Sequence, residues 1–142
     1  MHDRMKMDAI PVKSGARELI GALKTLDIPV AVATSSRRDH ATLHLGAAGL
    51  LDHFDTVVTR DDVVHPKPHP EPYLTAATRL GVRPQNCIAF EDSHAGVRAA
   101  HAAGMQTIMV PDLVHPTDEI ARLCVAVLDS LDHAHKRLIV AA

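Results

Sequence analysis

Hydrophobic and polar positions follow two different patterns along this chain. Four segments place apolar side chains three or four residues apart, which predicts helices: residues 14–26, 38–48, 72–80 and 93–103. Between them lie four short apolar or β-branched runs that are typical of buried strands: residues 28–34, 55–59, 87–90 and 106–110. Near the C-terminus the pattern predicts two more helices and a short strand: residues 116–123, 131–139 and 125–128.

The expected helix ends agree with this division of the chain. Ser14 and Ser93 stand where N-caps are expected. Gly49, Gly81 and Gly104 stand where helices are expected to end. Strands that alternate with helices predict an α/β, Rossmann-like parallel sheet with helices on both of its faces.

The composition narrows the class of protein. Hydrophobic residues make up 46% of the 142 residues and aromatic residues only 2%, so aliphatic side chains must fill the core. A net charge of −2 without a basic block argues against nucleic-acid binding. No apolar run approaches the length of a membrane helix, about 18 residues. With no repeat or linker, residues 1–142 are predicted to form one domain, and residues 1–8 are expected to be a remnant or a disordered leader.

Cysteines and histidines add little chemistry at this level. Cys87 and Cys124 lie in apolar surroundings and are interpreted as buried, reduced thiols, which favours a cytoplasmic location. The eleven histidines are scattered, with no HExxH motif and no Cys/His cluster, and are interpreted as surface residues.

Polar residues follow three of the predicted strands. Thr34 ends the first strand, Lys67 lies in a proline-rich loop after the second, and Glu91 and Asp92 follow the third. Taken singly, these are explained as an N-cap, a solvated lysine and favourable charges at a helix start. Ligands of parallel sheets bind where strands end, so their shared position favours a site.

The chemistry of this set suits a phosphorylated ligand. A hydroxyl beside the free N–H groups of a helix start, as at Thr34, can bind phosphate oxygens. The ammonium of Lys67 can neutralise phosphate charge. The adjacent carboxylates of Glu91 and Asp92 are hard oxygen ligands of the kind that Mg²⁺ prefers.

Three segments resemble motifs of the haloacid dehalogenase superfamily, in its β-phosphoglucomutase-like and phosphoglycolate-phosphatase-like branch. They are residues 30–36 (VAVATSS), 67–73 (KPHPEPY) and 90–97 (FEDSHAGV), and the resemblance extends over residues 9–131. It implies that Thr34 and the backbone of Ser35 bind the transferring phosphoryl group and that Lys67 stabilises the charges of the nucleophile and the phosphate. It also implies a Mg²⁺ ion held by Asp92 together with Glu91.

The resemblance further implies a small phosphorylated metabolite as substrate, such as a sugar phosphate or a 2-phospho acid. Arg37 is a weaker candidate for contacting the substrate or its phosphate. The segment that selects the substrate in this family, its cap domain, is missing from the sequence. The choice between phosphatase and phosphomutase therefore stays open.

One departure from the family matters most. The family's first motif, DxDGT at the end of a central strand, supplies the aspartate nucleophile and the general acid/base. This sequence contains no DxD, so the chain is expected to be an N-terminally truncated family member without phosphatase turnover. Without the central strand, the strands that end at Thr34 and Phe90 are expected to pair directly or to leave a gap. Marginal stability, or a homodimer that fills the gap, is the expected consequence.

Two other hypotheses remain to be weighed. A non-catalytic phosphate- or Mg²⁺-binding module, or a remnant of an enzyme, would also keep Thr34, Lys67 and Asp92. A response-regulator receiver domain uses Asp, Thr and Lys on a similar sheet. A receiver domain places its acidic cluster early in the chain, whereas Glu91 and Asp92 come after Thr34 and Lys67. This order argues against a receiver domain.

Overall fold

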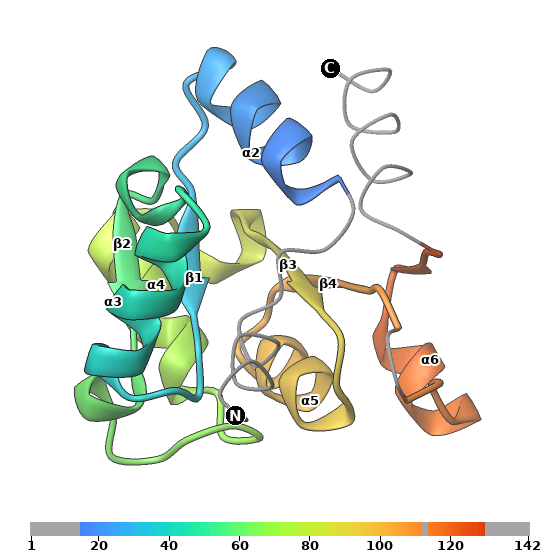
Figure 1. Cartoon of the computed structure of the whole chain (residues 1–142). Coiled ribbons are helices and arrows are strands. Elements are labelled where there is room, and N and C mark those ends of the chain that lie inside the picture. Colours follow the sequence, from blue (N-terminus) through green and yellow to red (C-terminus); the bar gives the residue numbers. More distant parts are fainter. Residues whose placement is uncertain (1–14, 112–113, 130–142) are drawn as a thin grey trace.

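The computed structural model describes residues 15–111 and 114–129 and has the predicted α/β architecture (Figure 1). Five α-helices lie within these residues: α2 (Ala16–Thr25), α3 (Arg38–Ala47), α4 (Glu71–Leu80), α5 (His94–Ala102) and α6 (Asp118–Leu123). Five strands lie there too: β1 (Ala31–Ala33), β2 (Thr56–Val58), β3 (Ile88–Glu91), β4 (Gln106–Met109) and β5 (Ala126–Val127). The short 3₁₀ helices are η1 (Leu51–His53), η2 (Arg60–Asp62) and η3 (Pro84–Asn86).

The strands form two parallel sheets. β1 pairs with β2, so that Val32 lies opposite Val57. β3 pairs with β4, and β4 pairs with β5, in a second sheet. In the described part of the chain no strand pairs with both β1 and β3, which agrees with the gap expected at the position of the family's central strand. Direct pairing of β1 with β3, the other expected outcome, is therefore wrong for these residues.

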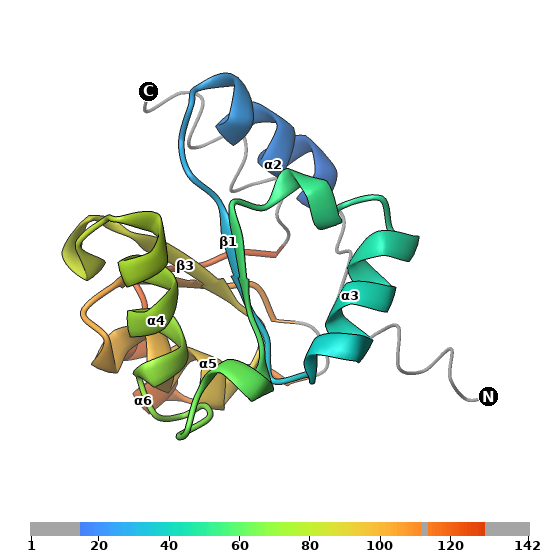
Figure 2. The same ribbon diagram turned by 90° about the vertical axis from the view of Figure 1, so that its left-hand side faces the viewer.

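Helices cover both faces of the β1–β2 sheet, with α3 and α4 on opposite sides of it (Figure 2). Val32 and Val57 pack against the α3 cluster around Ala41 and Leu45. Val58 packs against Ala76 of α4. Successive residues of a strand point to opposite faces, so Val57 and Val58 serve the two helix layers in turn.

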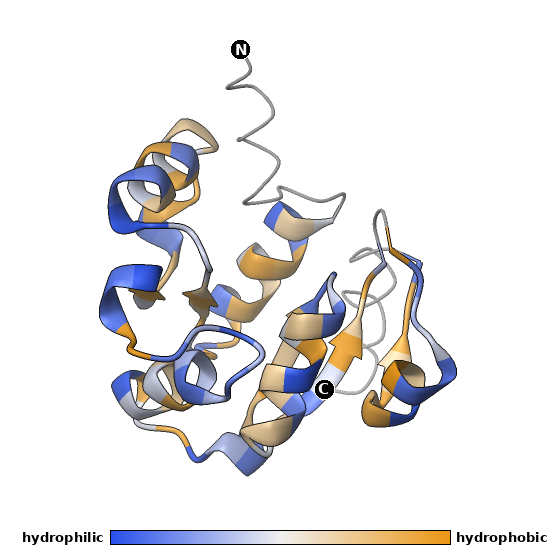
Figure 3. Cartoon of the chain, turned by 90° about the horizontal axis from the view of Figure 1, so that it is seen from below, coloured by the Kyte–Doolittle hydropathy of each residue, from blue (hydrophilic) through white to orange (hydrophobic). Residues whose placement is uncertain are grey.

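The β3–β4–β5 sheet is packed mainly by small residues. Ala89 of β3 lies in a cluster with Tyr73 and Ala77 of α4 and with Ala99 of α5. A second cluster joins Val97 of α5, Met109 of β4 and Ile120 of α6. The helices show mixed hydrophilic and hydrophobic bands, as amphipathic surface helices do (Figure 3). The abundance of alanine lets α4 and α5 lie close together over β3.

The predicted element ends are correct to within a few residues. Ser93 caps α5 as expected, because its Oγ accepts a hydrogen bond from the N–H of Gly96 at 3.0 Å. Gly81 takes the expected left-handed conformation after α4. The residue before α2 is Gly15, with a φ of 88°; the predicted cap Ser14 and the predicted helix 131–139 lie outside the described residues.

Two interpretations of side-chain burial need correction. Cys87 and Cys124 are free cysteines that are only half-buried, whereas buried thiols are expected from the sequence. His44 is buried, whereas all histidines were expected at the surface. Its position on α3 next to Ala41 and Leu45 explains this, because that face of the helix packs on the sheet.

Candidate active site

The loop between β2 and α4 carries Lys67 to the point where the two sheets meet. The Lys67 Nζ donates to the carbonyl oxygen of Ala33, the last residue of β1, at 2.9 Å. It also lies 2.5 Å from Oε2 of Glu91, the last residue of β3. The two side chains are only 12% and 6% exposed. One ammonium group therefore joins the C-terminal ends of β1 and β3.

Glu91 is held from three sides. Its Oε2 also accepts a hydrogen bond from the hydroxyl of Tyr73, on α4. Burial, together with the negative charge of Glu91, raises the pKa of Tyr73 well above its ordinary value, so the hydroxyl stays protonated and donates. A Cβ atom on Gly96 would overlap the Glu91 carboxylate, so only glycine fits at this position of α5.

Two hydrogen bonds of Thr34 shape the turn after β1. The N–H of Thr34 continues the β1–β2 ladder by donating to the carbonyl oxygen of Val58 at 2.9 Å. The Thr34 Oγ1 accepts from the N–H of Ser36 at 3.1 Å, which shapes the turn before α3. Ser35 and Arg37 are exposed, and Arg37 occupies the N-cap position of α3. Its side chain makes no capping bond.

Glu91 and Asp92 offer the oxygen ligands that a Mg²⁺ ion requires, so the residue types fit the ion. The Glu91 carboxylate contacts Lys67 and Tyr73, and Asp92 is half-buried just before α5. Mg²⁺ usually keeps several waters and takes phosphate oxygens, so one or two protein carboxylates suffice.

Two groups near Lys67 are not predicted as site residues by the sequence. Tyr73 stands at the end of the KPHPEPY segment, and the buried donor it supplies to Glu91 emerges only from packing of α4. Histidines 65 and 69 lie beside Glu71, although no recognised histidine motif is present. The available signal in the sequence was that His65, Lys67 and His69 alternate with prolines in one loop.

Asp62, also in this loop, has a structural role. It accepts from the N–H of Thr59 at 2.7 Å and pairs with Arg38 at 2.6 Å and Arg79 at 3.4 Å. Desolvation opposes its ionisation. The hydrogen bonds from Thr59 and Arg38 outweigh this effect and hold the pKa of Asp62 well below its usual range.

Comparison with known proteins identifies the family of this chain. The family model of the haloacid dehalogenase-like hydrolases matches residues 2–104. The chain belongs to this hydrolase family.

Individual relatives include phosphatases and a phosphomutase. The putative phosphatase YhcW of Bacillus subtilis is 37% identical in a match that covers 93% of this chain and 64% of YhcW. The fructose-1-phosphate phosphatase YqaB of Escherichia coli is 45% identical over 82 residues, covering 58% of this chain and 44% of YqaB. A β-phosphoglucomutase structure from Clostridium difficile superposes with a TM-score of 0.73 at 29% identity, over 89% of this chain and 57% of that one. The chain thus spans roughly half to two-thirds of these proteins.

None of the helices within the described residues has the length and apolar character of a membrane span.

Proposed function

We propose that this chain supplies the phosphate- and metal-binding half of a Mg²⁺-dependent phosphoryl-transfer site for small sugar phosphates. The observation that carries the proposal is the double contact of Lys67 with Ala33 and Glu91, at 2.9 Å and 2.5 Å. It supports a common site for the three motif segments, because it brings the ends of β1 and β3 together beside the lysine. The fructose-1-phosphate phosphatase and β-phosphoglucomutase relatives support a sugar phosphate as the substrate class.

Within this site each residue has a distinct task. The Thr34 hydroxyl and the N–H of Ser35 bind phosphate oxygens at the start of α3. Lys67 neutralises charge that builds up on the phosphate, and Glu91 and Tyr73 hold its ammonium in position. Asp92, with Glu91, would hold a Mg²⁺ ion, which stabilises the charge of a transferring phosphoryl group.

The 142-residue chain is proposed to bind phosphate without turning over a phosphate ester. Its sequence has no DxD, and the loss of a nucleophile that works as part of a unit costs on the order of 10⁶ in rate. A cytoplasmic location and reduced cysteines belong to the same proposal.

Two assays on the 142-residue chain test it. Titration with inorganic phosphate in the presence of Mg²⁺, followed by NMR of the backbone amides, is expected to shift Thr34, Ser35 and Asp92. Incubation with p-nitrophenyl phosphate or fructose 1-phosphate is expected to release no more product than a blank. Binding that is equally strong in Asp92→Asn without Mg²⁺ would favour a metal-independent phosphate-binding module.

Mg²⁺-dependent turnover that Asp92→Asn abolishes would overturn the proposed inactivity. Failure to bind phosphate at all would overturn the proposed site. A chimera that joins the portion of the E. coli fructose-1-phosphate phosphatase lying before its matched segment to the N-terminus of this chain tests the catalytic role directly. We expect it to regain Mg²⁺-dependent turnover and to lose it again in Lys67→Met.

A further inference from the structure

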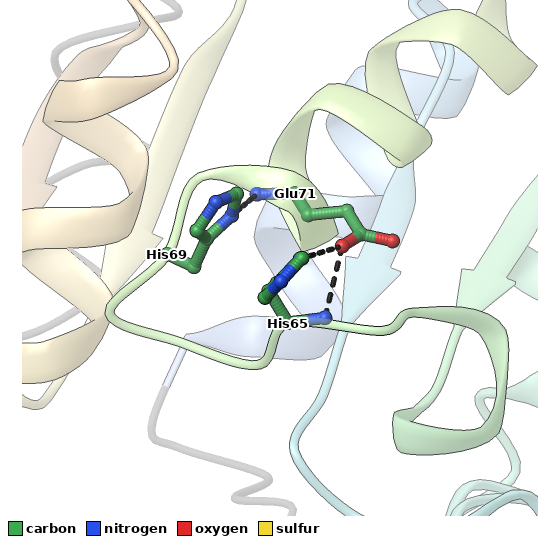
Figure 4. Close-up of side chains that lie close together, drawn as sticks. All are labelled: His65, His69 and Glu71. Atoms are coloured by element: carbon green, nitrogen blue, oxygen red, sulfur yellow. Dashed lines mark hydrogen bonds and ion pairs between the residues drawn. The ribbon is translucent and has the colours of Figure 1, made fainter.

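The loop that carries Lys67 brings together two imidazoles and a carboxylate outside the proposed phosphate site. His65, His69 and Glu71, called here the loop triad, each offer a ligand atom, and these atoms lie within 4.8 Å of one another (Figure 4). The two imidazole rings stack with centroids 4.5 Å apart. The His65 Nδ1 lies 3.1 Å from the Glu71 Oε1.

These separations are close to those of a bound metal ion. Two ligand atoms at about 2.0–2.2 Å from a tetrahedral zinc ion lie about 3.4 Å apart. The His65–Glu71 pair already meets this spacing, so an ion would take the place of the hydrogen bond between the two side chains. The ligand atom of His69 lies within 4.8 Å of the other two, so coordination by all three residues requires the His69 ring to move closer.

The backbone of the loop is organised before any ion binds. Pro66, Pro68 and Pro70 fix φ at alternate positions, which lowers the entropy lost when the loop is ordered. The Glu71 carboxylate closes the loop by accepting from the N–H groups of Val64 and His65 at 3.0 Å and 2.9 Å. These two hydrogen bonds lower the pKa of Glu71, so the carboxylate is ionised at neutral pH.

We propose that the loop triad binds a first-row transition-metal ion such as Zn²⁺, with water in the remaining coordination positions. Two imidazoles and one carboxylate, with the histidines exposed to solvent, form the donor set of an open zinc site. Imidazole nitrogen is a poor ligand for Mg²⁺, so this site is chemically distinct from the carboxylates at the end of β3. Lys67 lies midway between the two histidines in the sequence. A bound ion would therefore restrain the loop segment that carries the lysine.

Binding of Zn²⁺ alone, followed by calorimetry, tests the site. The unaltered chain is expected to bind one equivalent, and His65→Asn/His69→Asn is expected to bind more than about tenfold more weakly, since even outer partners of metal ligands contribute roughly 10- to 100-fold in affinity. Asparagine keeps an acceptor for the N–H of Glu71, which now bonds to the His69 Nδ1 at 3.0 Å. The matched control His53→Asn/His101→Asn removes two exposed histidines elsewhere and is expected to bind as the unaltered chain does.

Two further readouts make the test decisive. Zn²⁺ should raise the Tm of the unaltered chain and of the control, but not of the loop variant. Excess Mg²⁺ should not displace the bound Zn²⁺. If the double variant fails to fold, His65→Asn alone keeps the His69–Glu71 bond and serves in its place. Absence of Zn²⁺ binding, or a tight site that survives in the loop variant, overturns the proposal.

Discussion

The ammonium of Lys67 lies 2.5 Å from the carboxylate of Glu91, and this buried pair links the loop after β2 with the end of β3. The same ammonium contacts the Ala33 carbonyl oxygen of β1 at 2.9 Å. No described strand joins β1 to β3 by hydrogen bonds, so this pair and the α4 packing hold the two sheets together.

Removal of Lys67 should show how much the buried Lys67–Glu91 pair contributes to the free energy of unfolding. Lys67→Met leaves the Glu91 carboxylate buried beside Tyr73 without a counter-charge. We expect the free energy of unfolding, measured by urea titration, to fall by about 3 kcal/mol or more. Lys67→Met/Glu91→Gln should lose less than the sum of the two single variants, because neither charge is then left alone.

The exposed pair of Arg98 and Glu119 provides a control for that cycle. Its side chains are 44% and 64% exposed and lie 3.3 Å apart. Glu119→Gln is expected to change stability far less, because water screens the pair. Equal effects of Lys67→Met and Glu119→Gln would show that the buried pair has no special weight.

Gly96→Ala should disturb the same carboxylate by steric overlap. The added methyl group would occupy the space of the Glu91 carboxylate, so either α5 or Glu91 must shift. We expect a loss of about 1–3 kcal/mol in the free energy of unfolding, as in other overpacked cores. Gly21→Ala, on an open face of α2, should instead stabilise the chain by up to about 1 kcal/mol. A neutral Gly96→Ala would contradict the close approach.

The acid limb of the stability curve should depend on Asp62. Its pKa is depressed in the folded state, so it contributes stability that is present above the ordinary Asp pKa of about 4 and is lost as the pH falls below it. Asp62→Asn should therefore flatten the fall in unfolding free energy between about pH 5 and pH 3. Urea titrations across this range measure it, with the exposed Asp52→Asn as control. An unchanged acid limb in Asp62→Asn would exclude this contribution.

The gap between the sheets should appear in hydrogen exchange. β4 is paired on both sides, by β3 and β5, whereas β1 and β3 each have one paired side among the described residues. We expect amides of β4 to exchange most slowly. Protection of β1 equal to that of β4 would mean that another strand covers it. Loss of that protection on dilution would identify a second copy of the chain as its source, as in the homodimer expected from the sequence.

The local elements could be predicted because their signals are local. Apolar spacing identified α2 to α5, and turn residues such as Ser93 and Gly81 marked helix ends. Most strands are shorter than predicted, because pairing with a neighbour decides where a ladder stops, whereas β3 keeps the predicted length and is shifted by one residue. The register pairs Ala33, the last residue of β1, with Val58, the last residue of β2.

For the site, the sequence by itself determined the residue types and their order: Thr34, Lys67, Glu91 and Asp92, with no DxD. Only the tertiary structure decided their pairing. The Glu91 carboxylate bonds to Lys67, from the loop after β2, and to Tyr73, from α4. His65 and His69 lie beside Glu71 because the chain reverses direction in the proline-rich loop. The sequence spacing of these residues does not predict either set of contacts. Contacts of this kind depend on packing and on the cost of burying charge without a partner, and neither quantity can be read from neighbouring residues.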